Sequence, residues 1–162
     1  MSAFHPPLRP TPPTSQASIA PRTITPRDTP VVHSSPLVFP LDATDTTARV
    51  RQALLEDEAF NDVSTLATVV STRHVRSAIV ARRGGVVAGV PLAIEAFRQL
   101  DSGITIRIEA ADGTRIGAGG TVLALTGHAR GMLSAERTAL NYLQRLSGIA
   151  TLTRRFVEAV QL

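Results

Sequence analysis

The uneven placement of proline divides this chain near residue 40. Ten of the eleven prolines fall in residues 1–40, where they are mixed with serine and threonine. Proline fixes φ and removes a backbone N–H donor, so this segment can carry neither a regular helix nor a sheet ladder. We expect residues 1–40 to be a disordered extension. Its proline density also argues against the amphipathic helix of a transit peptide.

The remainder of the chain shows the patterns of folded structure. Residues 45–60 are typical of a short helix with Val50, Ala53 and Leu54 facing inward. Pro91 suits the first turn of a second helix that extends through Leu100. The hydrophobic content of 43% is enough to supply a core for one domain of this size.

Strand-like runs lie between and after these helices. Residues 75–81 and 86–89 flank two arginines and two glycines, which favours a hairpin. Isoleucines alternate with polar residues over 104–109, a period of two that predicts a half-buried strand, and 121–125 supplies another. We therefore expect residues 41–133 to form an α+β domain, a small antiparallel sheet packed with helices.

A last amphipathic helix is predicted to begin at Ser134, whose hydroxyl can cap its first turn. Glu136 then lies where the helix dipole favours negative charge, but Arg137 adds positive charge beside unsatisfied N–H groups. That combination suits an anion. An exposed arginine without a ligand, or one neutralised by Glu136, fits the same residues, and the pattern alone leaves both open.

Several other features of the sequence do not indicate a catalytic or binding site. The glycine-rich run 117–120 precedes a strand and lacks the lysine of a phosphate loop, so we interpret it as a bend. His128 has no second histidine at metal-ligand spacing, and the carboxylates at 56–58 point to different sides of a turn. Because all 17 basic residues are arginine and cysteine is absent, lysine and thiolate mechanisms are excluded within these 162 residues. Dispersed charge and six aromatic residues argue against nucleic-acid binding.

The run 134–151, SAERTALNYLQRLSGIAT, resembles the ER-T-ALN-LQ-LSGIAT segment of quinolinate phosphoribosyltransferases. Residues 53–57 and 61–65 resemble the family's opening helix and its acidic GDVTT turn, with Asn61 where glycine is usual. Residues 78–89 and 127–133 are similar to its first hairpin and to the link into the signature helix.

The resemblance implies an N-terminal α/β-hammerhead-like domain followed by an α/β barrel that begins within residues 134–162. It implies transfer of a phosphoribosyl group from PRPP to quinolinate with Mg²⁺, giving nicotinate mononucleotide, pyrophosphate and CO₂ for NAD biosynthesis. It also implies a homodimer or higher oligomer in the cytoplasm, in which the arginine matching Arg137 contacts the substrate carboxylate in the neighbouring barrel. Glu136, Asn141 and Gln144 match the motif as supporting residues. The remaining catalytic groups and the metal ligands are expected after residue 162, in a barrel missing by truncation, so we predict that the chain alone is inactive.

Two alternatives remain. One is a related phosphoribosyltransferase of the molybdenum-associated ModD type, which has the same architecture and another acceptor. The other is a non-enzymatic interaction module that docks through an exposed sheet and an apolar face formed by Leu140, Leu143 and Leu146. No apolar run is long enough for a membrane span.

Overall fold

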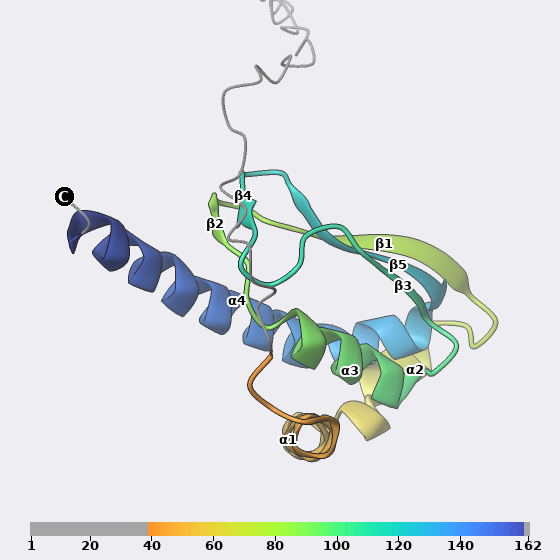
Figure 1. Ribbon diagram of the computed structural model, residues 1–162. Coiled ribbons are helices and arrows are strands. Elements are labelled where there is room, and N and C mark those ends of the chain that lie inside the picture. Colours follow the sequence, from red (N-terminus) through yellow and green to blue (C-terminus); the bar gives the residue numbers. More distant parts are fainter. Residues whose placement is uncertain (1–38, 161–162) are drawn as a thin grey trace, which may run out of the picture.

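The computed structural model describes residues 39–160, and Figure 1 shows how their elements are arranged. The three-stranded sheet forms one layer, helices α3 and α4 lie against it, and α1 lies beyond them. The elements in chain order are α1 (Ala43–Glu56), the 3-10 turn η1 (Ala59–Asn61), α2 (Val63–Thr68), β1 (His74–Val80), β2 (Gly85–Val86), α3 (Val90–Leu100), β3 (Thr105–Ile108), β4 (Arg115–Ile116), β5 (Thr121–His128) and α4 (Ala129–Val160).

The described strands form two antiparallel sheets. β5 is the central strand of the larger sheet, in the order β1-β5-β3, and β2 pairs with β4 in the smaller one. The register of β1 on β5 shifts between Ile79 and Val80, which indicates a bulge after the glycine-rich turn. This arrangement confirms the expected α+β class with a small antiparallel sheet packed with helices. The predicted disordered extension over 1–40 lies almost wholly outside the described residues.

The predicted hairpin between 75–81 and 86–89 is wrong, because β1 and β2 belong to different sheets. Gly85 serves a close approach of the chain to α4 and not a two-stranded turn. A Cβ atom on Gly85 would lie 2.6 Å from the Oγ1 atom of Thr151, and the Val86 N–H donates to that same oxygen at 2.8 Å. The smaller sheet is therefore held against the helix by its backbone.

Helix α1 follows the predicted pattern. The Asp42 carboxylate caps it by accepting from the Asp45 N–H at 2.7 Å. Val50 and Leu54 are fully buried, as expected, and Ala53 is half-buried. After the helix, Glu58 takes a positive φ of 52°, which turns the chain into η1 and α2.

Helix α3 also agrees with its prediction. Pro91 occupies the first turn, and Leu92, Ala96 and Phe97 are buried. Gly89 precedes the helix with φ of 95°, and a Cβ atom there would lie 2.8 Å from the Cδ1 atom of Leu146 on α4. Glycine is required at this point both for its backbone conformation and for the close packing of the two helices.

The strand predictions hold with changes at the ends. Burial falls along the alternating isoleucines, from Ile104 at 6% exposed through the half-buried Ile106 to Ile108 at 50%. β5 extends beyond the predicted end at residue 125 and reaches His128. The 117–120 segment is the predicted turn, with φ of 81° at Gly119.

Helix α4 begins at Ala129, and the predicted start at Ser134 is wrong. β5 leads into it without a break, and the Ala129 N–H donates to the Arg73 carbonyl at 2.8 Å. The helix is 32 residues long and continues through Gly148, so the predicted domain boundary at 133/134 falls inside it. No helix within residues 39–160 is long and apolar enough to cross a membrane.

The two ends of α4 have different surroundings. Its first half is packed against the rest of the fold through Ala135, Ala139 and Leu143. The face proposed for docking from the sequence is therefore not open, since Leu143 is 5% exposed and Leu146 packs on the core. The exposed apolar residues of α4 lie mainly farther along and are Leu133, Ile149, Leu152, Phe156, Val157 and Val160.

Candidate functional site

Arg137 lies on the surface of α4, eight residues after the helix begins. Its Nη1 atom donates to Oδ1 of Asp57 at 2.9 Å, and its side chain is 74% exposed. The partner is thus Asp57 from the end of α1, and not Glu136. Because Arg137 is not in the first turn, the sequence argument that unsatisfied helix N–H groups add to its positive charge is wrong.

Asp62 lies close by and connects α2 to α4. Its Oδ1 atom accepts from the Thr65 N–H at 3.0 Å, which caps α2, and its Oδ2 atom accepts from the Ser134 hydroxyl at 3.1 Å. The hydrogen bonds with Thr65, assisted by the one from Ser134, hold the pKa of Asp62 below its ordinary value of 3.8 and outweigh partial burial. The carboxylate is therefore ionised at neutral pH.

A polar cavity of about 260 Å³ lies among these groups, between the α1–α2 connection and α4. Asp57, Glu58 and Asp62 contribute three carboxylates to its lining, whereas Arg137 contributes the only guanidinium among the lining residues. The formal charge of the lining is therefore negative, and the cavity itself disfavours an anion. An anion can meet Arg137 only on the outward, exposed side of its guanidinium.

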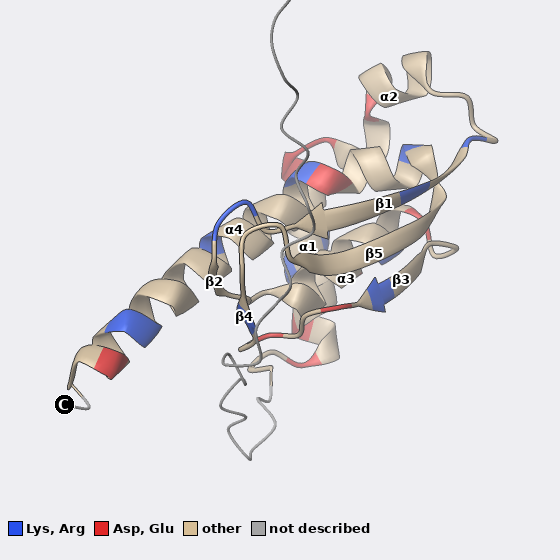
Figure 2. Cartoon of the chain, turned by 90° about the horizontal axis from the view of Figure 1, so that it is seen from above, with Lys and Arg blue, Asp and Glu red and all other residues tan. Residues whose placement is uncertain are grey.

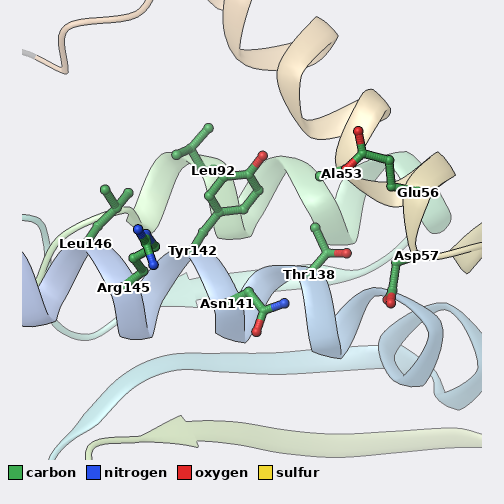
Figure 3. A pocket seen from close by; sticks show the side chains of 9 residues that line it. All are labelled: Ala53, Glu56, Asp57, Leu92, Thr138, Asn141, Tyr142, Arg145 and Leu146. Atoms are coloured by element: carbon green, nitrogen blue, oxygen red, sulfur yellow. The ribbon is translucent and has the colours of Figure 1, made fainter.

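A second, larger cavity of about 500 Å³ lies on the other side of Asp57, between α1, α3 and α4 (Figure 3). Figure 3 shows Tyr142 extending from α4 between the helices, with Arg145 and Leu146 beside it on the same helix. Asp57 lines both cavities. The full lining is Ala53, Glu56, Asp57, Leu92, Thr138, Asn141, Tyr142, Arg145 and Leu146.

Tyr142 is the aromatic residue of this cavity. Its hydroxyl donates to the Arg49 carbonyl at 3.4 Å. Burial raises the pKa of the Tyr142 phenol above 10.0, and nearby Glu56 adds to this while Arg49 opposes it. The phenol is thus a neutral hydrogen-bonding group in this cavity at neutral pH.

Arg145 was not singled out from the sequence. It is exposed and lines the larger cavity, and among the described residues no carboxylate forms an ion pair with it. A sequence signal for it exists, because Arg137, Asn141 and Arg145 recur at intervals of four and so lie along one ridge of the helix. Asn141, which the sequence placed as a supporting residue, also lines this cavity.

His128 differs from its sequence interpretation because it is not alone. β1 brings His74 opposite it in the sheet register, and Asp101 lies on its other side. Within residues 39–160, no three or more histidine, cysteine, aspartate or glutamate side chains converge as a metal site. Figure 2 shows the arginines spread over several elements and interspersed with acidic residues, as expected from the sequence.

Comparison with known proteins identifies this fold. Residues 62–147, more than half of the chain, match the model for the quinolinate phosphoribosyl transferase N-terminal domain. The chain is 40% identical over 117 residues to the carboxylating nicotinate-nucleotide pyrophosphorylase of Mycobacterium leprae, covering 69% of this chain and 40% of that protein. It is 38% identical over 116 residues to the chloroplastic enzyme of Oryza sativa, covering 71% and 31%.

Solved structures agree. NadC from Streptococcus pyogenes superposes with a TM-score of 0.72 at 33% identity, covering 77% of this chain and 45% of that one. The nicotinate-nucleotide pyrophosphorylase from Francisella tularensis gives 0.67 at 32% identity, covering 72% and 41%. The chain thus spans less than half the length of these relatives. The matched region contains Asp62 and all the α4 residues that line the two cavities. The chain belongs to the quinolinate phosphoribosyltransferase family through its N-terminal domain.

Proposed function

We propose that this chain is the N-terminal part of an enzyme that transfers a phosphoribosyl group from PRPP to quinolinate. The products are nicotinate mononucleotide, pyrophosphate and CO₂, for NAD biosynthesis in the cytoplasm. The observation that carries the proposal is the family match over 62–147, which includes Arg137 itself. Because the chain spans 31–40% of the length of the rice and M. leprae relatives, we expect no turnover from it alone.

Arg137 is the residue proposed to bind substrate. A guanidinium has five N–H donors, and the ion pair with Asp57 engages Nη1. The exposed remainder can bind a carboxylate of quinolinate through two parallel hydrogen bonds. By the family resemblance, we propose that this carboxylate belongs to a substrate held in the barrel of another subunit, so the proposal requires a homodimer or higher oligomer with shared sites. The acidic cavity agrees with this, because it leaves only the outward side of Arg137 for an anion.

The chemistry explains why an arginine is suited to this position. As pyrophosphate leaves, positive charge develops at the ribose carbon, and several anionic groups lie close together. Such a reaction is accelerated by fixed cations and not by a strong nucleophile. Arg137 has a planar fork that orients one substrate carboxylate, and it remains charged throughout.

The proposal includes Mg²⁺, because the family resemblance implies that this ion is used together with PRPP. Among the described residues, no group of three or more potential ligands converges. By the family resemblance, the magnesium ligands are expected after residue 162, and the role proposed for Arg137 includes no step at the ion.

Complementation between subunits tests the proposal. The partner is the full-length M. leprae enzyme in which the arginine aligned with Arg137 is replaced by alanine. We expect this chain, when mixed with it, to restore quinolinate-dependent release of pyrophosphate, and the Arg137→Ala chain to fail. Arg155→Ala is the matched control, because Arg155 is an exposed arginine of α4 that lines neither cavity. Equal rescue by the Arg137→Ala chain would contradict the proposed role, as would turnover by the chain alone that Arg137→Ala left unchanged.

The exposed apolar residues of α4 support a second candidate, an interaction module without catalytic activity. Ile149, Phe156 and Val160 are 56%, 65% and 80% exposed. Apolar surface of this kind associates with other proteins. This candidate predicts that the chain co-elutes with the full-length homologue in size exclusion yet restores no turnover, and that Phe156→Ser abolishes co-elution. The alternative of a ModD-type phosphoribosyltransferase makes a different prediction. In the complementation assay, release of pyrophosphate would then depend on an acceptor other than quinolinate.

A further inference from the structure

Two histidines face each other across the larger sheet. His74, the first residue of β1, is the register partner of His128, the last residue of β5. Their Nε2 atoms are 3.0 Å apart, and their ring centroids are 4.1 Å apart. Both side chains are exposed. Solvent and ions therefore reach the space beside the two nitrogens.

Asp101 fixes the orientation of His128. Its Oδ2 atom lies 3.2 Å from His128 Nδ1, and its Oδ1 atom accepts from the Gly103 N–H at 2.8 Å. A Cβ atom on Gly131 would lie 2.6 Å from Cβ of Asp101. The carboxylate thus lies between the end of α3 and the first turn of α4, and Gly103 holds it in addition to His128.

This contact sets the tautomer of His128. When Nδ1–H donates to Asp101, Nε2 of the neutral ring carries a lone pair that points toward His74. A carboxylate behind a histidine in this way fixes the orientation of the ring and of its metal-binding nitrogen. Without a metal, His74 Nε2–H can donate to that lone pair.

We propose that His74 and His128 bind one late first-row divalent cation, for which Zn²⁺ is the probe, through their Nε2 atoms. With metal–nitrogen bonds of 2.0–2.1 Å, two nitrogens in a tetrahedral site lie about 3.3 Å apart. The observed 3.0 Å needs only a small rotation of either exposed ring. Binding displaces the proton between the rings, and His74 then carries its proton on Nδ1.

The remaining positions around the ion are taken by water, because no third ligand converges among the described residues. The site should therefore bind its ion more weakly than a structural zinc site with four protein ligands does. By the order of affinities of imidazole sites, Cu²⁺ binds more tightly than Zn²⁺. Asp101 acts as a positioning residue and does not contact the ion.

The test is calorimetric titration of ZnCl₂ into the untagged, chelator-treated full chain at neutral pH. We expect one Zn²⁺ per chain at this site, and loss of that binding in His74→Gln and in His128→Gln. Asp101→Asn should weaken it by about 10–100-fold. The chain has four histidines, so the His5→Gln/His33→Gln double variant is the control and should bind as the unmodified chain does.

A spectroscopic readout keeps the test independent of enzymatic activity. With Cu²⁺, electron paramagnetic resonance should show coupling to two nitrogens, reduced to one in either single variant. Circular dichroism confirms that the variants fold, as expected for substitutions at exposed positions. Binding that survives both single variants would overturn the proposal, as would loss of binding only in the His5/His33 variant. Absence of binding at millimolar Zn²⁺ would mean that the pair is only a hydrogen-bonded one.

Discussion

Ser134 donates its hydroxyl to Asp62 across 72 residues of sequence, with 3.1 Å between Oγ and Oδ2. The same carboxylate caps α2 through the Thr65 N–H. One aspartate therefore starts a short helix and fastens it to the long one. Because α2 has only six residues, it depends on such tertiary contacts for its stability.

Replacing Asp62 with asparagine should lower the urea midpoint of unfolding at neutral pH, while Ser134→Ala, which spares the cap, should lower it less. The pH dependence follows from the lowered pKa of Asp62. This contribution to stability is fully present above the unfolded value of 3.8 and is lost as the pH falls through the lower folded value. The difference between wild type and Asp62→Asn should thus shrink in acid. A difference unchanged between neutral pH and acid would contradict this.

Replacing Arg137 should affect function far more than stability. The ion pair with Asp57 has an arginine side chain that is 74% exposed, and such pairs contribute about 0–1 kcal/mol. Thermal unfolding of Arg137→Ala should therefore resemble that of the wild type, although complementation is lost. Arg137→Lys keeps the charge without the planar fork, and should restore only a fraction of the rescue.

Gly89 and Gly148 should respond oppositely to alanine. Gly89→Ala puts a side chain at φ of 95° and 2.8 Å from Leu146, so it should destabilise the fold by about 1–3 kcal/mol. Gly148 lies in α4 with open space around its Cβ direction, so Gly148→Ala should stabilise by about 0.5–1 kcal/mol. Urea denaturation measures both free energies of unfolding, and equal signs would contradict the packing described for α3 and α4.

The Tyr142 phenol can be titrated without interference, because the chain has one tyrosine and no tryptophan. Ultraviolet absorbance of the phenolate should show ionisation above pH 10.0 in the folded chain, since burial raises the pKa. Stability linked to this group is complete below the unfolded value and is lost as the pH rises through the folded one. Tyr142→Phe should remove that alkaline loss. The same titration in urea gives the unfolded reference, and coincident curves would contradict the burial.

Local signals in the sequence predicted some elements well. α3 has a proline in its first turn and a strong apolar stripe, and the bend at 117–120 has its glycines. The start of α4 was missed because β5 passes into the helix with no glycine or proline between them. Ser134 has the chemistry of a cap, yet its partner lies on α2.

The other differences between the sequence predictions and the structure arise from contacts between residues far apart in the sequence. The glycines at 84–85 resemble a turn, but Gly85 is needed for contact with Thr151 on α4. His128 was interpreted as isolated because His74 lies 54 residues away along the chain. For Arg137 the sequence indicated a candidate anion contact, but not its pairing with Asp57 or the acidic cavity behind it. Such pairings depend on packing that periodicity does not encode.

Asp57 is shared by the two cavities beside α4. Its carboxylate accepts one hydrogen bond from the Arg137 guanidinium, and a carboxylate that binds the outward side of Arg137 leaves this ion pair in place. Asp57 therefore fixes the direction in which Arg137 offers its remaining N–H donors. The approach of an anion to α4 is thus set by the end of α1 as much as by the long helix itself.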